Sequence, residues 1–122
     1  MSKPRQLLAR WGETLAAERL AAQGYTILAQ NVRTPYGEID IVARDLAFIV
    51  FVEVKTRSST TYGQPEESIT ARKRAHLLAS AQHYLQTHPE LEGGWRIDVI
   101  AIRRQPPAPL EFVHFENAIG RD

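Results

Sequence analysis

The chain has 122 residues, which suits one domain with a single hydrophobic core and leaves little room for a second. It contains no cysteine, which excludes disulfides and thiolate metal sites and favours a reducing, cytoplasmic environment. The net charge of +1 excludes a protein that coats nucleic acid through bulk electrostatics, so any phosphate binding has to be local. We expect no membrane partner, because no export signal is evident and the longest apolar run, Leu46–Val52, is too short to cross a bilayer.

The first third of the chain predicts a helix followed by two strands. Apolar residues recur at helical spacing from Leu7 to Gln23, and Gly24 can end that helix. We expect a strand at Tyr25–Val32 and a turn at Thr34–Gly37, because proline presets the backbone and glycine relieves the bend. A second strand is expected at Glu38–Ala43.

The rest of the chain adds a central strand, a helix and two more strands. Phe48–Thr56 is β-branched, aromatic and too apolar to be solvated on either face, which is typical of a central strand. Arg57–Pro65 is rich in turn-forming residues and should be a loop, and Thr70 can cap a helix that runs to about His88. The last two strands, the second at a sheet edge, are expected at Trp95–Ile102 and Leu110–Phe115. The order α-β-β-β-α-β-β indicates an α/β fold.

An acid and a lysine interrupt the most apolar strand. Glu53 and Lys55 are two residues apart, so the alternation of a strand puts both on one face, while Val52 and Val54 point the other way. The ordinary explanation is an ion pair on a sheet edge, which contributes little if exposed and is costly if buried. The pair, however, lies on a central strand that follows a strand with another acid. This placement favours a functional site.

Asp40 shares the Glu53 face only if the loop between the two strands has an even number of residues. With Asp45 and Leu46 as that loop, Asp40 lies opposite Phe51 and roughly 7–8 Å from Glu53 along the diagonal. At that separation two carboxylates can hold one cation between them. A three-residue loop would break the site.

Two carboxylates drawn together without a cation would repel each other, and one would take up a proton. Oxygen ligands with no His or Cys nearby favour Mg²⁺ or Mn²⁺ over zinc. The expected reaction is phosphodiester hydrolysis, in which the metal lowers the pKa of a bound water and neutralises charge on the phosphate. Lys55 would hold and polarise the attacking water.

The segments Gly37–Asp40 and Phe51–Arg57 resemble the PD-(D/E)xK nuclease signature and, more narrowly, the YraN-like bacterial family. The resemblance covers nearly the whole chain and includes Gly12-Glu13, Gly24-Tyr25, Asn31–Arg33, Tyr62-Gly63, Lys73, Arg96–Val99 and Asn117-Ala118. The pattern is also similar to archaeal Holliday-junction resolvases, where a helix glutamate precedes a Gly-aromatic pair, as Glu13 does here. Ile39 stands where the signature has proline, which affects the strand bend rather than a ligand.

This resemblance implies a restriction-endonuclease-like core, a mixed central β-sheet flanked by helices, and a metal-dependent DNA endonuclease that could act on branched or structured DNA. It implies that the ligands of Mg²⁺ or Mn²⁺ are Asp40, Glu53 and the Val54 carbonyl, with Glu13 assisting. It also implies that Lys55 acts on the water. A homodimer with two sites on two strands would follow from the resolvase analogy.

The choice of the helix acid rests on the family spacing. Glu13 lies at one border of the apolar stripe and Glu18 at the other, so periodicity alone does not choose between them or exclude an ordinary solvated acid. The family spacing favours Glu13. Glu38, on the Asp40 face, is either solvated or a partner of the ligands.

Cations crowd the first turns of the second long helix, where the helix macrodipole disfavours them unless a phosphate is bound. A role in binding DNA phosphates is weighed evenly against a solvated basic face. The residues concerned are Arg72, Lys73, Arg74 and the neighbouring His76, with Arg57 just after the central strand.

The other polar and aromatic residues have structural interpretations. We expect Asp98 and Arg96 to form a structural ion pair rather than a pair that orients groups near the site. Surface or packing positions are expected for His83, His88 and His114, and core positions for Trp11 and Trp95. Two alternatives to the nuclease are a catalytically silent nucleic-acid-binding module with the same fold, and an adaptor whose charged strand face is incidental.

Overall fold

The computed structural model describes residues 3–58 and 69–119. Its elements follow the predicted order: α1 (Lys3–Ala22), β1 (Thr26–Thr34), β2 (Gly37–Asp45), β3 (Phe48–Arg57), α2 (Ala71–Thr87), β4 (Gly94–Arg103) and β5 (Glu111–Phe115). Most bounds differ from the predicted ones by one or two residues, but α1 begins four residues earlier. Pro4 permits that start because the first turn of a helix needs no backbone N–H from it.

The five strands form one mixed sheet in the order β1-β2-β3-β4-β5. Neighbours are antiparallel except β3 and β4, which are parallel and are therefore joined by a crossover that contains α2. The predictions of an α/β fold, a central β3 and an edge strand at β5 are confirmed.

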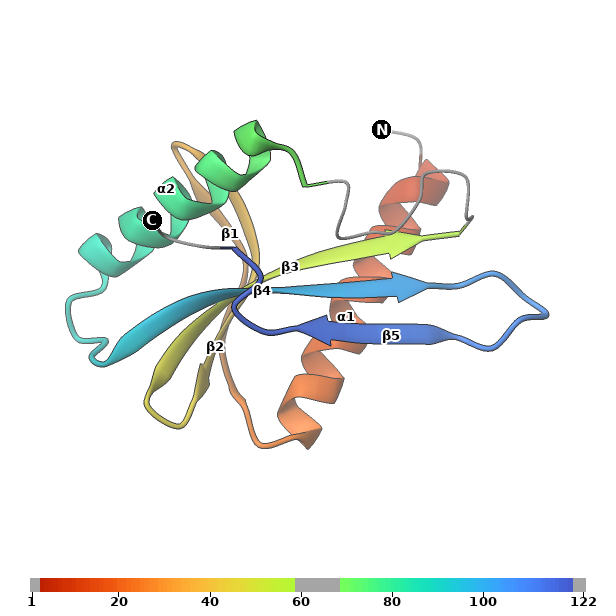
Figure 1. The fold of residues 1–122 in the computed structure, drawn as a ribbon, viewed down its shortest axis with the longest axis horizontal. Helices are drawn as coiled ribbons and strands as arrows, with labels where there is room; N and C mark the ends of the chain where they lie inside the picture. The colour runs from red at the N-terminus through yellow and green to blue at the C-terminus, as the bar shows by residue number, and fades with distance from the viewer. Residues whose placement is uncertain (1–2, 59–68, 120–122) are drawn as a thin grey trace.

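The two helices cover opposite faces of the sheet (Figure 1). Alternate residues of β3 separate into the two cores, with Val50 and Val52 beneath α1 and Ile49 and Phe51 beneath α2. The two tryptophans were expected in the core and are partly buried against it, Trp11 on the α1 side and Trp95 on the α2 side. Neither helix in the described part of the chain is long and apolar enough to span a membrane.

The hairpin between β2 and β3 corrects one prediction. The predicted even length of the loop is confirmed, because the loop has two residues. These residues are Leu46 and Ala47 rather than Asp45 and Leu46, and Asp45 pairs with Phe48. Asp45 stays in the strand because its carboxylate binds the Arg96 guanidinium at 3.3 Å.

The register is therefore shifted by two residues from the predicted one. Val42, not Asp40, lies opposite Phe51, and the last backbone pair joins Ile41 to Val52. Continuing this register by one residue would bring Asp40 level with Glu53, rather than diagonally across from it as predicted.

The β1–β2 hairpin bends beyond this point. Asn31, one residue past the pairing of Gln30 with Ile41, has a φ of 53°, in the left-handed region. The bend carries the hairpin tip toward α2, where Thr34 Oγ1 lies 2.9 Å from Ser80 Oγ. Asp40 thus sits where β2 leaves the flat part of the sheet.

Candidate active site

The central strand supplies an acid and a base to the α2 face of the sheet. Glu53 is buried, with 5% of its surface exposed, and it follows the apolar residues Ile49 and Phe51 on its face of β3. Lys55 Nζ lies 3.4 Å from Glu53 Oε2, which confirms that the two side chains share one face. An unpaired carboxylate at this depth would be costly, so the contact offsets part of the cost of burial.

Asp40 reaches this pair from β2. Its Oδ2 accepts a hydrogen bond of 2.8 Å from the backbone N–H of Val54, which lies beyond the last backbone pair of the two strands. Burial, then repulsion from Glu53 and Glu13, raises the pKa of the Asp40 carboxyl to about 8, although the Val54 hydrogen bond and Lys73 oppose the rise. The carboxyls of Asp40, Glu53 and Glu13 are therefore near enough to disfavour one another's charge.

Helix α1 brings Glu13 to the same place. Gly12 makes this possible, because a Cβ at that position would overlap Oγ1 of Thr56 on β3. Glu13 is half-buried, and burial, then Glu38 and Glu53, raise the pKa of its carboxyl, while Arg10 and a hydrogen bond with Asp40 lower it. Glu18 is exposed, so Glu13 is the helix acid that lies beside the strand acids.

Helix α2 contributes a cation to the site. Lys73 Nζ lies 3.4 Å from Glu53 Oε2, the same oxygen that Lys55 approaches. Thr70 positions this turn, since its side chain caps the helix by accepting a hydrogen bond of 3.1 Å from the Lys73 backbone N–H. Lys73 was expected to bind a phosphate or solvent, and its pairing with Glu53 was not foreseen. The sequence signal for an ordered Lys73 was its position three residues after the helix cap, Thr70.

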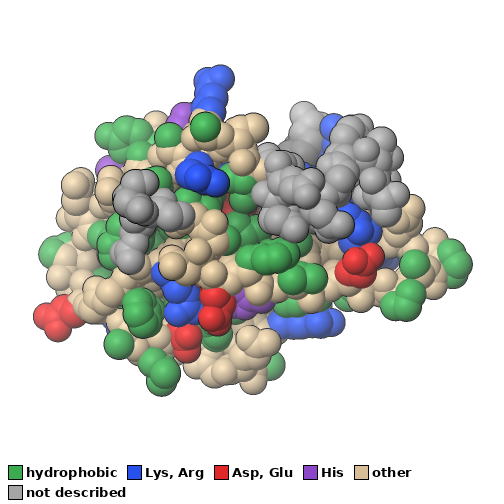
Figure 2. Space-filling view, in the orientation of Figure 1, with side chains coloured by type: hydrophobic (Ala, Val, Ile, Leu, Met, Phe, Trp, Pro, Cys, Tyr) green, Lys and Arg blue, Asp and Glu red, His purple; other side chains and the backbone are tan. Residues whose placement is uncertain are grey.

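The other predicted phosphate-binding residues lie on the first turns of α2 and at the end of β3. Arg72 and Arg74 are exposed on α2, and the Arg57 guanidinium donates to the Thr56 carbonyl at 3.1 Å. The predicted loop Arg57–Pro65 falls largely on residues 59–68, outside the described part of the chain. Figure 2 shows acidic and basic side chains interspersed on the face in view, which agrees with the low net charge.

Asp98 and Arg96 form a separate structural network. Asp98 is fully buried on the α1 side of the sheet and accepts hydrogen bonds from Arg96 Nε at 3.0 Å and the Asn117 N–H at 2.8 Å. His114 Nε2 lies 2.8 Å from the other oxygen. The interpretation of Asp98 and Arg96 as a structural ion pair is supported, and His114 proves to be part of it. Of the remaining histidines, His83 packs on Tyr36 and His88 stacks on Tyr84.

Comparison with known proteins places the chain in a family. A model of "Uncharacterised protein family UPF0102" matches residues 12–102. The chain belongs to this family. One relative, a UPF0102 protein of Dehalococcoides mccartyi, is 44% identical over 123 residues that cover 100% of both chains. A relative from Syntrophotalea carbinolica is 44% identical over 100% of this chain and 98% of its own length. A relative from Roseiflexus castenholzii is 50% identical over 84% of this chain and 83% of its own length. The YraN-like resemblance is thereby confirmed.

The donor atoms of this UPF0102 protein suit a hard cation. Within the described residues no group of three or more His, Asp or Glu side chains is gathered closely enough to hold a metal by itself. Mg²⁺, however, commonly uses only one or two carboxylates together with water and substrate phosphate. Asp40 and Glu53 provide two, and one Asp40 oxygen is already held by Val54. A divalent cation would also offset the burial and the repulsion from Glu53 and Glu13 that raise the pKa of Asp40.

Proposed function

We propose that this UPF0102 protein is a metal-dependent endonuclease that hydrolyses phosphodiester bonds in DNA, with branched or structured DNA as its substrate. One observation carries the proposal. The half-buried Asp40 carboxyl, fixed by the Val54 N–H, lies among the carboxyls of Glu53 and Glu13, with Lys55 against Glu53. Such a cluster lowers stability when its members are ionised, and clusters of this kind are typical of functional sites.

Each residue has a distinct task in this proposal. Asp40, Glu53 and the Val54 carbonyl would hold Mg²⁺ or Mn²⁺, with Glu13 assisting from α1. When bound, the ion supplies a water of lowered pKa and neutralises charge on the phosphate. Lys55 is a compact point charge that orients the attacking water.

The hydrolysis consumes one water. Its oxygen bonds to phosphorus and the water gives up one proton to solvent, while the bond from phosphorus to the leaving sugar oxygen breaks and that oxygen takes up a proton from solvent. The positive groups around the site would hold the flanking phosphates, and we assign this task to Arg57, Arg72 and Arg74. A cytoplasmic homodimer with one site for each DNA strand completes the proposal.

The second candidate function is a nucleic-acid-binding module without turnover. One observation favours it: Lys55 and Lys73 both approach Glu53 Oε2 at 3.4 Å. Two ammonium groups can balance the Glu53 charge without a metal. In that case the site would bind a phosphate through the lysines and leave the phosphodiester bond intact.

Calorimetric titration with Mn²⁺ separates the two functions. The wild type, Glu53→Gln and the matched control Glu18→Gln are compared, since Glu18 is an exposed acid of the same length outside the site. Thermal unfolding first confirms that each variant is folded. The endonuclease predicts Mn²⁺ binding that is lost in Glu53→Gln and kept in Glu18→Gln, with metal-dependent cutting of a branched or a linear DNA by the wild type. A folded wild type that binds no Mn²⁺, with or without DNA, would overturn the nuclease and favour the binding module.

A further inference from the structure

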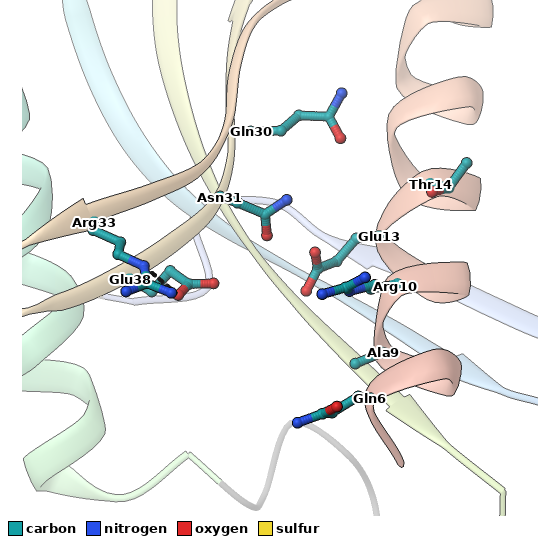
Figure 3. Close-up of a pocket in the computed structure, with 9 residues that line it drawn as sticks. All are labelled: Gln6, Ala9, Arg10, Glu13, Thr14, Gln30, Asn31, Arg33 and Glu38. Atoms are coloured by element: carbon teal, nitrogen blue, oxygen red, sulfur yellow. Dashed lines mark ion pairs between the residues drawn. The ribbon is translucent and has the colours of Figure 1, made fainter. Parts of the chain in front are cut away.

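A pocket of about 650 Å³ opens beside the acidic site, between α1 and the β1–β2 hairpin (Figure 3). The helix lines it with residues of one face, among them Gln6, Arg10 and Glu13, which follow one another at helical spacing. The hairpin lines the other side with Gln30 and Asn31. Pockets that bind small ligands commonly have volumes of this size.

The chemistry of the lining points to a polar ligand. Three primary amides, on Gln6, Gln30 and Asn31, each carry a donor and an acceptor side by side. Paired donors and acceptors of this kind match the edges of nucleic-acid bases. Arg10 adds a cation beside them, close enough to Glu13 to lower the pKa of its carboxyl. Ala9 is the main apolar residue of the lining, which disfavours an apolar ligand.

Asn31 is held in an unusual conformation at this pocket. Its φ of 53° places it in the left-handed region, which costs most residues energy and is tolerated best by glycine and asparagine. In Figure 3 the Asn31 amide points toward Glu13, from the hairpin across to the helix. Asparagine is one of the residues that this backbone accepts, and unlike glycine it also places an amide at the pocket.

The pocket adjoins the proposed catalytic carboxylates through Glu13. This residue lines the pocket, and its carboxyl is close enough to Asp40 for each of the two to affect the pKa of the other. A nucleic-acid strand whose scissile phosphate lies at Asp40 and Glu53 would therefore pass the pocket with an adjacent nucleotide.

We propose that this pocket binds one nucleotide next to the scissile phosphate, with the Asn31 and Gln30 amides on the base or sugar and Arg10 on the phosphate. The inference rests on the proposed function for the direction of the strand through the site. It adds to that function a place where the enzyme reads a nucleotide rather than the backbone alone. A nucleotide of DNA and one of RNA share this chemistry, and the test distinguishes them.

The test uses Asn31→Gly, which deletes the amide but suits the left-handed backbone. Asn117→Gly is the matched control, because Asn117 has a φ of 50°, is exposed and bonds Asp98 only through its backbone N–H. Binding of fluorescent single-stranded deoxyribo- and ribo-oligonucleotides is followed by anisotropy with a chelator present. Amide side-chain NMR signals are recorded alongside, and the Asn31 signal is assigned by its absence from Asn31→Gly.

We expect Asn31→Gly to weaken binding of one oligonucleotide type by about tenfold and Asn117→Gly by less than about twofold. The wild-type Asn31 signal should shift on saturation. The proposal is overturned if both variants bind like the wild type, if that signal stays in place, or if the wild type binds neither oligonucleotide. Because the chelator removes metal, these results are independent of the cleavage assay that tests the endonuclease.

Discussion

The ammonium group of Lys73 lies 3.4 Å from Oε2 of Glu53 and so connects the first turns of α2 to the central strand. Lys55 approaches the same oxygen from the strand itself. Glu53 is thus a buried carboxylate with two cations, one from its own strand and one from a helix on the α2 face. This contact joins the start of α2 to the site and adds a second cation to its charge balance.

Replacing Lys73 by glutamine should therefore lower stability more than replacing its neighbours. Lys73 is partly exposed, so the expected loss is that of a screened ion pair, roughly 0.5–1 kcal/mol in the free energy of unfolding. Arg72→Gln and Arg74→Gln are exposed controls on the same helix and should change it by less than about 0.5 kcal/mol. Urea unfolding with a chelator present measures all three. Equal losses in the three variants would contradict a specific contact between Lys73 and Glu53.

The sequence was sufficient to predict the order of the elements and the face that carries the site. Alternation along β3 determines that Glu53 and Lys55 point together, because the side-chain period of a strand is fixed at two. The cap at Thr70 was equally predictable, since its hydroxyl accepts a hydrogen bond from the Lys73 backbone N–H. These are local properties of the chain.

The features that were missed depend on contacts between distant residues. The β2–β3 turn was placed one residue early because Asp45 is a common turn residue, whereas its bond to Arg96 keeps it in the strand. The pairing of Lys73 with Glu53 joins residues twenty positions apart and needs the packed helix. The bend at Asn31, which shapes the pocket, carries no pattern of hydrophobic residues that could reveal it.

Asp40 should make the metal-free protein less stable as the pH rises. Its carboxyl has a pKa of about 8 in the folded protein against a reference of 3.8, so the folded state binds the proton more tightly. The stabilising contribution is complete below the reference pKa and is lost progressively as the pH rises to about 8. The loss is at most about 1.4 kcal/mol for each pH unit.

Asp40→Asn tests this linkage. The variant should remove that pH dependence and be more stable than the wild type at pH 8, while Glu18→Gln should follow the wild type. Urea unfolding between pH 5 and 9 with a chelator present gives the comparison. Parallel profiles for Asp40→Asn and the wild type would contradict a raised pKa at Asp40.

Gly12→Ala should destabilise the protein although alanine is the better helix former. The exchange would gain about 1 kcal/mol in an unhindered helix. Here the added methyl meets Thr56, and overpacking of this kind costs roughly 1–3 kcal/mol. The displacement of α1 should also move Glu13 and weaken Mn²⁺ binding.

A double-mutant cycle with Thr56→Ala isolates the contact between Gly12 and Thr56. Removal of the Thr56 hydroxyl and methyl leaves room for the new Cβ, so Gly12→Ala should be less costly in that background, by about 0.5–3 kcal/mol. Thermal or urea unfolding of the four proteins provides the cycle. A zero coupling energy would mean that α1 is not held against β3 at this position.

Asp98→Asn should destabilise the fold without weakening the metal site. Asp98 is fully buried, and removal of its charge leaves the Arg96 guanidinium without its buried partner, at a cost of up to about 3–5 kcal/mol. Burial raises the pKa of Asp98, but hydrogen bonds from His114, Asn117 and Arg96 outweigh it and hold that pKa below its usual value. The stability from this carboxylate is therefore present above pH 4 and is lost as the pH falls through the lowered pKa.

Urea unfolding of Asp98→Asn and the wild type should consequently differ most at neutral pH and converge in acid. Asp98 faces α1 whereas Glu53 faces α2, so Mn²⁺ affinity of the folded variant should stay within about twofold of the wild type. Glu53→Gln should show the reverse pattern, with metal binding lost and the Asp98 network intact. Loss of Mn²⁺ binding in a folded Asp98→Asn protein would show that the two faces of the sheet are coupled and that the network belongs to the site.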